Sequence, residues 1–129
     1  MSERTKVLAT APLLLVSDLQ RSLHFYQQKL GFEGPAVHEE PLCFAMLNRN
    51  GFDLTLTLAE DGSGVRPNGP TGSWDVYVGV ADVGAEIVEL TAAGVKIDGG
   101  PTDTFYEMRE VKVVDPDEHR WCFGQDLTA

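Results

Sequence analysis

Hydrophobic and polar residues alternate strictly from Phe52 to Leu58, and aliphatic residues recur at every second position from Val76 to Val80 in the stretch that begins at Trp74. Successive side chains of a β-strand point to opposite faces of its sheet. Both stretches are therefore predicted to be strands with one apolar face towards a core and one mixed face. The mixed faces carry Asp53, Thr55 and Thr57 in the first stretch, and Asp75, Tyr77 and Gly79 in the second.

Two other stretches show helical periodicity, and the second repeats the first. Residues 16–19, Val-Ser-Asp-Leu, begin a predicted helix over 18–30 in which Asp18 is placed to cap the first turn. The pattern of Val, any residue, Asp and an apolar residue returns at residues 80–83, Val-Ala-Asp-Val, followed by a predicted helix over 82–93. Because an internal repeat indicates repeated architecture, the chain is predicted to contain two copies of one unit. The apolar face of the first helix consists of Leu19, Leu23, Tyr26 and Leu30.

The remaining patterns complete both copies as strand, helix and three strands. We expect Gly99-Gly100-Pro101 to break the chain after a short strand, and His119 to be exposed after a turn. The predicted architecture is α+β in a single domain, residues 1–129, with a first module at 7–60, a linker at 61–72 and a second module at 73–126. The other predicted strands are 7–16, 32–39, 42–47, 95–97, 105–114 and 119–125, with turns at 48–51 and 115–118.

Composition and charge exclude some classes of partner. The formal net charge of −10 argues against nucleic acid, which requires clustered Lys and Arg, and it suits a cationic ligand. No apolar run has the length of a membrane span, and no signal-like segment follows the first residues, so we expect a cytoplasmic protein that does not enter a membrane. Cys43 and Cys122 are too few and too far apart for a disulfide framework.

The repeat and its motifs resemble the vicinal oxygen chelate superfamily, which includes glyoxalase I, bleomycin-resistance proteins, fosfomycin-resistance enzymes and extradiol dioxygenases. The resemblance implies a glyoxalase-like fold, in which two βαβββ modules form a curled mixed sheet around a ligand. Glu118 departs from the family pattern, which usually has Gly there. The motifs are Val16-Ser17-Asp18-Leu19, Phe25-Tyr26, Leu30-Gly31-Phe32, Arg109-Glu110 and Asp115-Pro116-Asp117.

The same resemblance gives the positions at which metal-dependent members supply their ligands. They fall on Ala11, at or near Thr55, on Asp75 and on Cys122. Alanine cannot coordinate a cation, and only Asp75 is an ordinary ligand for a hard metal. The sequence therefore predicts no metal, no cofactor and no catalytic residue. A glyoxalase- or dioxygenase-like metalloenzyme with an altered ligand set is the alternative, and a catalytic Cys122 thiol also stays open.

Without a metal, the mixed strand faces favour a small-molecule site. The chain is most similar to the bleomycin-resistance-like branch, whose members are dimers that sequester a cationic glycopeptide. The resemblance implies a metal-independent homodimer that binds a small molecule in the hollow between the modules. A structural or regulatory protein with a vestigial hollow is a further alternative. The predicted ligand-binding residues are Thr55, Trp74, Asp75, Tyr77, Phe105, Tyr106, Arg109, Arg120 and Cys122.

Overall fold

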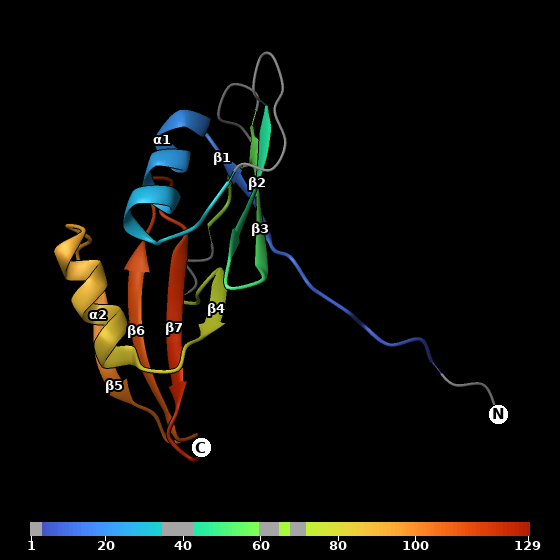
Figure 1. Ribbon diagram of the computed structural model, residues 1–129. Coiled ribbons are helices and arrows are strands. Elements are labelled where there is room, and N and C mark those ends of the chain that lie inside the picture. The colour runs from blue at the N-terminus through green and yellow to red at the C-terminus, as the bar shows by residue number, and fades with distance from the viewer. Residues whose placement is uncertain (1–3, 35–42, 60–64, 68–71) are drawn as a thin grey trace.

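The computed structural model of the chain describes residues 4–34, 43–59, 65–67 and 72–129. Two α-helices, a π-helical turn and seven strands make up this part of the chain (Figure 1). In chain order they are β1 (Leu13–Val16), α1 (Leu19–His24), η1 (Phe25–Lys29), β2 (Phe44–Arg49), β3 (Phe52–Leu58), β4 (Val76–Gly79), α2 (Val83–Ala92), β5 (Gly99–Asp103), β6 (Met108–Val114) and β7 (Arg120–Asp126).

The strands form two sheets of the same design. The first sheet has the order β1-β3-β2 and the second the order β4-β7-β6-β5. In each sheet the first strand runs parallel to the last strand of its module, which in turn pairs antiparallel with the strand before it. This repetition confirms the predicted α+β glyoxalase-like fold. None of the helices in the described ranges is long and apolar enough to cross a membrane.

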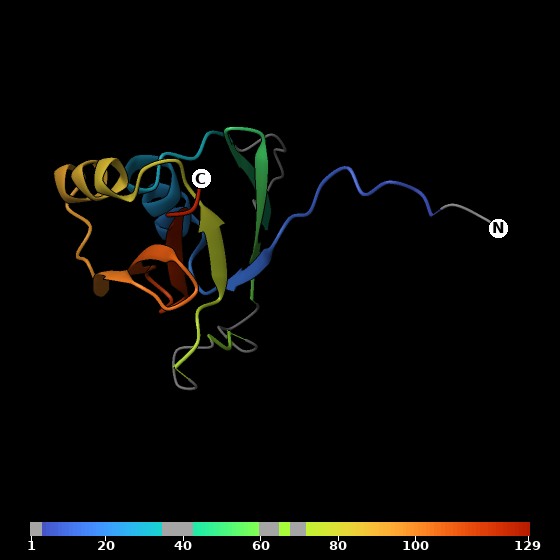
Figure 2. The same cartoon turned by 90° about the horizontal axis from the view of Figure 1, so that it is seen from below.

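α2 packs on the four-stranded sheet and α1 on the three-stranded sheet. The π-helical η1 reaches the four-stranded sheet through Tyr26, whose ring centroid lies 5.4 Å from that of Trp121. Figure 2 shows both helices on the same side of the four-stranded sheet. The predicted apolar face of the first helix is buried in full. It joins the aliphatic faces of both sheets in one hydrophobic cluster. Asp18 and Asp82 cap the two helices by accepting hydrogen bonds from Arg21 N and Ala85 N, at 3.0 and 3.2 Å. The second half of the predicted helix over 18–30 winds as the π-helical η1.

The first strand is shorter than predicted. It begins at Leu13 and not at residue 7, because Pro12 has no N–H group for a sheet, although its carbonyl accepts a hydrogen bond from Thr55 N at 3.0 Å. Nothing in the described chain pairs with residues 4–11 as a strand. These residues, the arm, extend away from the body in Figure 1. Val7 and Leu8 in the arm are 76% and 88% exposed.

Two other predicted boundaries are wrong. Residues 95–97 do not form a strand, and β5 instead contains Gly99-Gly100-Pro101, where a break was expected. The pairing with β6 shifts register between Gly99 and Thr102, and this irregularity accommodates the proline in an edge strand. Residues 105–107 form a turn before β6. Most of the predicted strand at 32–39 and most of the linker at 61–72 lie outside the described residues.

The Asp115-Pro116-Asp117 turn joins the two halves of the molecule. Asp115 Oδ2 accepts a hydrogen bond from Tyr26 Oη at 2.6 Å, and Tyr26 Oη accepts one from Trp121 Nε1 at 2.9 Å. His119 is buried, which corrects the expectation of exposure, because its ring lies 2.8 Å from the same carboxylate oxygen. Glu118 has a φ of 69°, which a side chain adopts at a cost of about 1 kcal/mol.

His119 should make stability depend on pH. Burial lowers the pKa of His119, but the hydrogen bond and the charge of Asp115 outweigh burial and raise the pKa above its ordinary value. Protonated His119 then stabilises the fold fully below its unfolded pKa of about 6.5, and this contribution is lost as the pH rises through the raised folded pKa. We expect urea titrations to give a falling free energy of unfolding above about pH 6.5. The same slope in His119→Gln would contradict this assignment.

Candidate functional site

The face of the four-stranded sheet that points away from the helices, here called the open face, carries most of the predicted site. Val76, Val111 and Trp121 point from β4, β6 and β7 into the core. Because side chains alternate along a strand, their neighbours point the opposite way. Tyr77, Cys122 and Lys112 lie side by side on the open face, followed one row along by Gly79, Gly124 and Glu110.

Glu110 is the centre of a hydrogen-bonded cluster on the open face. Tyr77 Oη and Tyr106 Oη each donate to Glu110 Oε2, both at 2.8 Å. The arrangement requires glycine at position 124, since a Cβ there would lie 1.9 Å from Tyr77 Oη. Sequence reasoning did not include Glu110 among the site residues. The available signal was its position in β6, where Glu110 and Lys112 alternate with two buried valines.

Aromatic rings flank this cluster in two pairs. The rings of Trp74 and Tyr77 have centroids 5.1 Å apart, and those of Phe105 and Tyr106 are 5.0 Å apart. Trp74 is 37% exposed and Tyr106 is 46% exposed, so ring surface remains accessible beside the buried carboxylate. Burial raises the pKa of the Tyr77 phenol, and the hydrogen bond to Glu110 and the charge of Glu110 raise it further. The hydrogen bond to Glu110 is the main cause that raises the pKa of the Tyr106 phenol. Both tyrosines are therefore neutral hydrogen-bond donors.

The other predicted residues have different positions. Arg120 N donates to Asp75 Oδ2 at 2.8 Å, which holds Asp75 against the end of β7. Thr55 lies in the other sheet, in the row between Leu13 and Met46, on the face opposite the shared core. Within a single chain, Thr55 is therefore not part of the Glu110 cluster.

Arg109 also lies apart from the cluster. It has the same alternation as the buried Val111, so it points to the helix side of the sheet. There its Nε lies 2.7 Å from Asp103 Oδ1, and both side chains are substantially exposed.

Cys122 is buried next to Glu110 and is not an activated nucleophile. Burial and the negative charge of Glu110 raise the pKa of this thiol to about 12. Because the thiolate is the reactive form, we expect iodoacetamide at pH 8 to modify the exposed Cys43 in the folded protein and to spare Cys122 until urea unfolds it. Peptide mass analysis of the two sites measures this difference. Rapid modification of Cys122 in the folded protein would restore the hypothesis of a catalytic thiol.

The four positions that correspond to the family's metal ligands do not form a metal site. Ala11 lies in the exposed arm and has no donor atom, while the Cys122 thiol stays protonated. Within the described ranges, no group of three or more His, Cys, Asp and Glu side chains is placed to hold a metal ion. This donor set does not fit the divalent cation of the metal-dependent enzymes.

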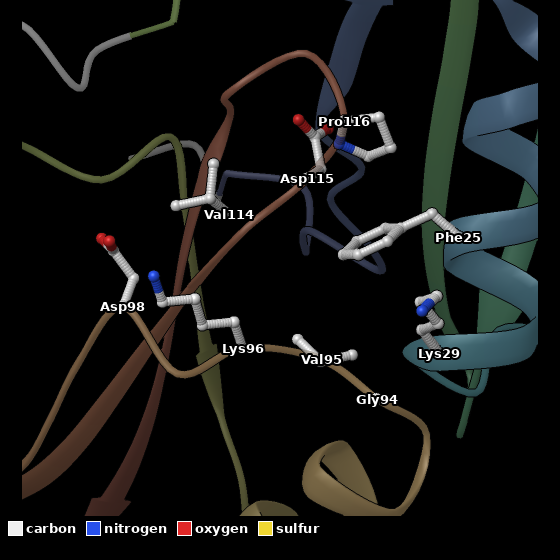
Figure 3. Close-up of a pocket in the computed structure, with 9 residues that line it drawn as sticks. All are labelled: Phe25, Lys29, Gly94, Val95, Lys96, Asp98, Val114, Asp115 and Pro116. Carbon is white, nitrogen blue, oxygen red and sulfur yellow. The ribbon is translucent and has the colours of Figure 1, made fainter.

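Two cavities lie away from Glu110, and Tyr77 and Gly79 of the open face are among the residues that line the larger one. The smaller, about 290 Å³, lies between η1, the chain after α2 and the Asp115 turn, with Lys29 and Lys96 on its walls (Figure 3). The larger, about 730 Å³ and here called the seam cavity, lies between the β2–β3 turn, β4 and α2. The ion pair of Arg49 and Glu86, 2.5 Å long, lines the seam cavity. Neither cavity includes Trp74, Tyr106 or Glu110.

Comparisons with known proteins agree with this fold. The chain is similar to a glyoxalase/bleomycin resistance protein/dioxygenase from Nocardioides (23% identity, 97% of this chain and 87% of that chain, TM-score 0.70). It is also similar to TnmS3, an antibiotic binding protein from Streptomyces sp. CB03234 (23%, 96% and 99%, TM-score 0.70), and to TioX from Micromonospora sp. ML1 (24%, 94% and 100%, TM-score 0.71). No curated protein matches the chain.

The family model described as Glyoxalase/Bleomycin resistance protein/Dioxygenase superfamily matches residues 7–123, which is nearly the whole chain. The chain therefore belongs to the glyoxalase/bleomycin resistance protein/dioxygenase superfamily.

Proposed function

We propose that this chain is a metal-independent small-molecule-binding protein of the bleomycin-resistance-like type, working as a homodimer in the cytoplasm. It holds its ligand against the open face and contributes no covalent step. One observation carries the proposal: in place of a set of metal-binding side chains, the open face presents an aromatic and hydrogen-bonding cluster. The cluster consists of Trp74, Tyr77, Tyr106 and Glu110. Aromatic walls with a few placed polar groups are typical of small-molecule sites.

The chemistry of the cluster favours binding over catalysis. Tyr77 and Tyr106 are held neutral and the Cys122 thiol is held protonated, so none of them is poised to transfer a proton or attack a substrate near neutral pH. The similar protein TnmS3 is an antibiotic binding protein, and a binding role for this chain agrees with that likeness. The net charge of −10 would raise the rate at which a cationic ligand arrives.

Two surfaces of the single chain support a dimer. The outer face of the three-stranded sheet exposes Leu13 and Met46 around Thr55, and the arm exposes Val7 and Leu8. The strands β1 and β4 are edge strands in the described sheets, and edge strands pair readily with a second chain. A second copy that lays its arm along β4 and its Thr55 face over the open face would bury these apolar groups and enclose a ligand.

Thermal melting in the presence of a chelator tests the binding function. The protein is melted in EDTA with a panel of cationic glycopeptide antibiotics and flat aromatic metabolites. A compound present at about one hundred times its dissociation constant should add about 2.7 kcal/mol to the stability of the folded state. Stabilisation that appears only after Zn, Ni, Fe or Mn is added, or stoichiometric metal retained through dialysis, would favour the metalloenzyme and contradict the proposal.

A deletion tests the dimer separately. Light scattering behind size-exclusion chromatography should give a dimer for the full chain. Removal of residues 1–11 should give a monomer with the same circular dichroism spectrum, because the arm contributes nothing to the core of its own chain. A full chain that is monomeric at high concentration, or a dimer that survives the deletion, would contradict this mode of assembly.

A further inference from the structure

Among the residues that the structure describes, the buried carboxylates have a basic partner, with one exception. A carboxylate out of water is costly unless a cation or several donors compensate its charge. Glu110 is 4% exposed and forms no ion pair with any described residue. The compensated carboxylates pair as Glu86 with Arg49 at 2.5 Å, Asp115 with His119 at 2.8 Å, and Asp117 with Arg21 at 3.2 Å.

No lysine or arginine of the chain is a partner for the Glu110 carboxylate. All ten Lys and Arg residues lie in the described ranges, and none of them forms an ion pair with Glu110. Lys112 shares the open face but lies opposite Cys122, one row away from Glu110. Two neutral phenols and the neighbouring thiol are the groups that compensate the carboxylate.

The surroundings of Glu110 are suited to an organic cation. A hydrogen bond from a phenol to a carboxylate makes its ring richer in electrons, and Tyr77 and Tyr106 both donate to the same oxygen. Cations bind over the faces of Trp and Tyr rings, and a carboxylate behind the rings strengthens this attraction. Trp74 and Tyr106 expose ring surface beside Glu110, so a positively charged group can reach the rings without displacing the hydroxyls.

We propose that the open face is a cation-recognising site for ligands that carry an aromatic ring and a protonated amine. This proposal rests on the binding function proposed above. The amine lies against the rings of Trp74, Tyr77 and Tyr106, and the charge of Glu110 selects it over a neutral group. The flat part of the ligand extends along Phe105 and Tyr106, whose rings form the second wall. Glu110 is a positioning residue, since it acts through the two tyrosines.

Two matched probes test this selectivity. The cation is 1-naphthylmethylammonium, and the neutral control is 1-naphthalenemethanol, which has nearly the same shape. Dissociation constants are measured by tryptophan fluorescence in EDTA at pH 7. We expect wild-type protein to bind the cation about tenfold more tightly than the alcohol, a ratio in the range of cation–aromatic contacts and hydrogen bonds to charged groups. Glu110→Gln keeps the size of the side chain, and should bind both probes equally while its affinity for the alcohol is unchanged.

Glu107→Gln is the matched control variant, because it removes one exposed carboxylate from the neighbouring turn. It should keep the wild-type ratio, which separates the action of Glu110 from a general loss of negative charge. Circular dichroism melts of both variants check that the fold is kept.

Four results would overturn this proposal. The first is equal binding of both probes by wild-type protein, and the second is a Glu110→Gln variant that keeps the wild-type ratio of affinities for the cation and the alcohol. Both would contradict selectivity by Glu110 without contradicting the binding function. The third is that neither probe binds, which would also contradict the proposed selectivity. The antibiotic panel then tests the binding function independently. A Glu110→Gln variant that weakens the dimer and leaves the probe ratio unchanged would show that a basic residue of a second copy, such as Arg4 or Lys6 of its arm, is the partner of Glu110.

Discussion

Replacing Asp115 by alanine is expected to lower the free energy of unfolding by about 3–5 kcal/mol, which is the usual cost of removing one member of a buried charged pair. Asp115 accepts hydrogen bonds from Tyr26 Oη at 2.6 Å and from the backbone N–H groups of Asp117 and His119 at 2.9 and 2.8 Å. It also lies 2.8 Å from the ring of His119. Alanine would leave these donors buried without a partner. Urea denaturation followed by tryptophan fluorescence measures the loss.

Asp103→Ala is the control for this substitution. Asp103 also pairs with a basic residue, Arg109, but both side chains are exposed. Pairs of this kind contribute about 0–1 kcal/mol, so the control should change stability little. Equal losses in the two variants would mean that the Asp115 turn does not hold the modules together. The pH slope assigned to His119 should also vanish in Asp115→Ala, because the charge that raises the pKa of His119 is gone.

Replacing Gly124 by alanine is expected to abolish the preference for the cationic probe. An alanine Cβ at this position would lie 1.9 Å from Tyr77 Oη and 2.5 Å from Tyr77 Cζ, so the ring must leave Glu110. The loss of one wall should weaken binding of 1-naphthylmethylammonium at least about tenfold, the size expected for losing a hydrogen bond to a charged group and its aromatic contact. Forcing a methyl group into this packed site should also lower stability by about 1–3 kcal/mol.

Gly79 provides a matched control one strand away. It pairs directly with Gly124 in the sheet, yet a Cβ at Gly79 would meet nothing within 4 Å. Gly79→Ala should therefore keep both stability and the wild-type ratio of the two probes. Fluorescence titration and thermal melting of the two variants give the comparison. A Gly124→Ala protein that still prefers the cation would mean that Tyr77 takes no part in binding.

Much of the fold could be predicted because its local signals agree with its tertiary contacts. The alternation from Phe52 to Leu58 is β3 in the structure, and the helix caps at Asp18 and Asp82 accept the expected backbone hydrogen bonds. Even there one residue differs, since Phe52 is 71% exposed beside the turn although its alternation places it with the core. The pattern gives the face of a strand but not how far the core extends along it.

The features that could not be predicted depend on partners distant in sequence. Gly99-Gly100-Pro101 breaks most strands, but here the edge position and a register shift allow it to be β5. His119 is buried because a carboxylate four residues earlier, Asp115, lies 2.8 Å from its ring nitrogen and forms an ion pair with it. Glu110 joins Tyr77 across 33 positions of the chain, and only the register of β4, β7 and β6 places the two side chains together. Alternation alone indicated the face for Tyr77 and Cys122, but not the carboxylate of Glu110 one row along that face.

Chemical-shift mapping of the metal-stripped protein tests the binding site most directly. Labelled protein is titrated with 1-naphthylmethylammonium in EDTA, and the amide and indole signals are followed. The largest shifts are predicted at Trp74, Tyr77, Tyr106 and Gly124, on and beside the open face. Shifts centred on the seam cavity, at Arg49, Phe52 and Glu89, or shifts that appear only when a divalent metal is restored, would contradict ligand binding by an aromatic face without a metal.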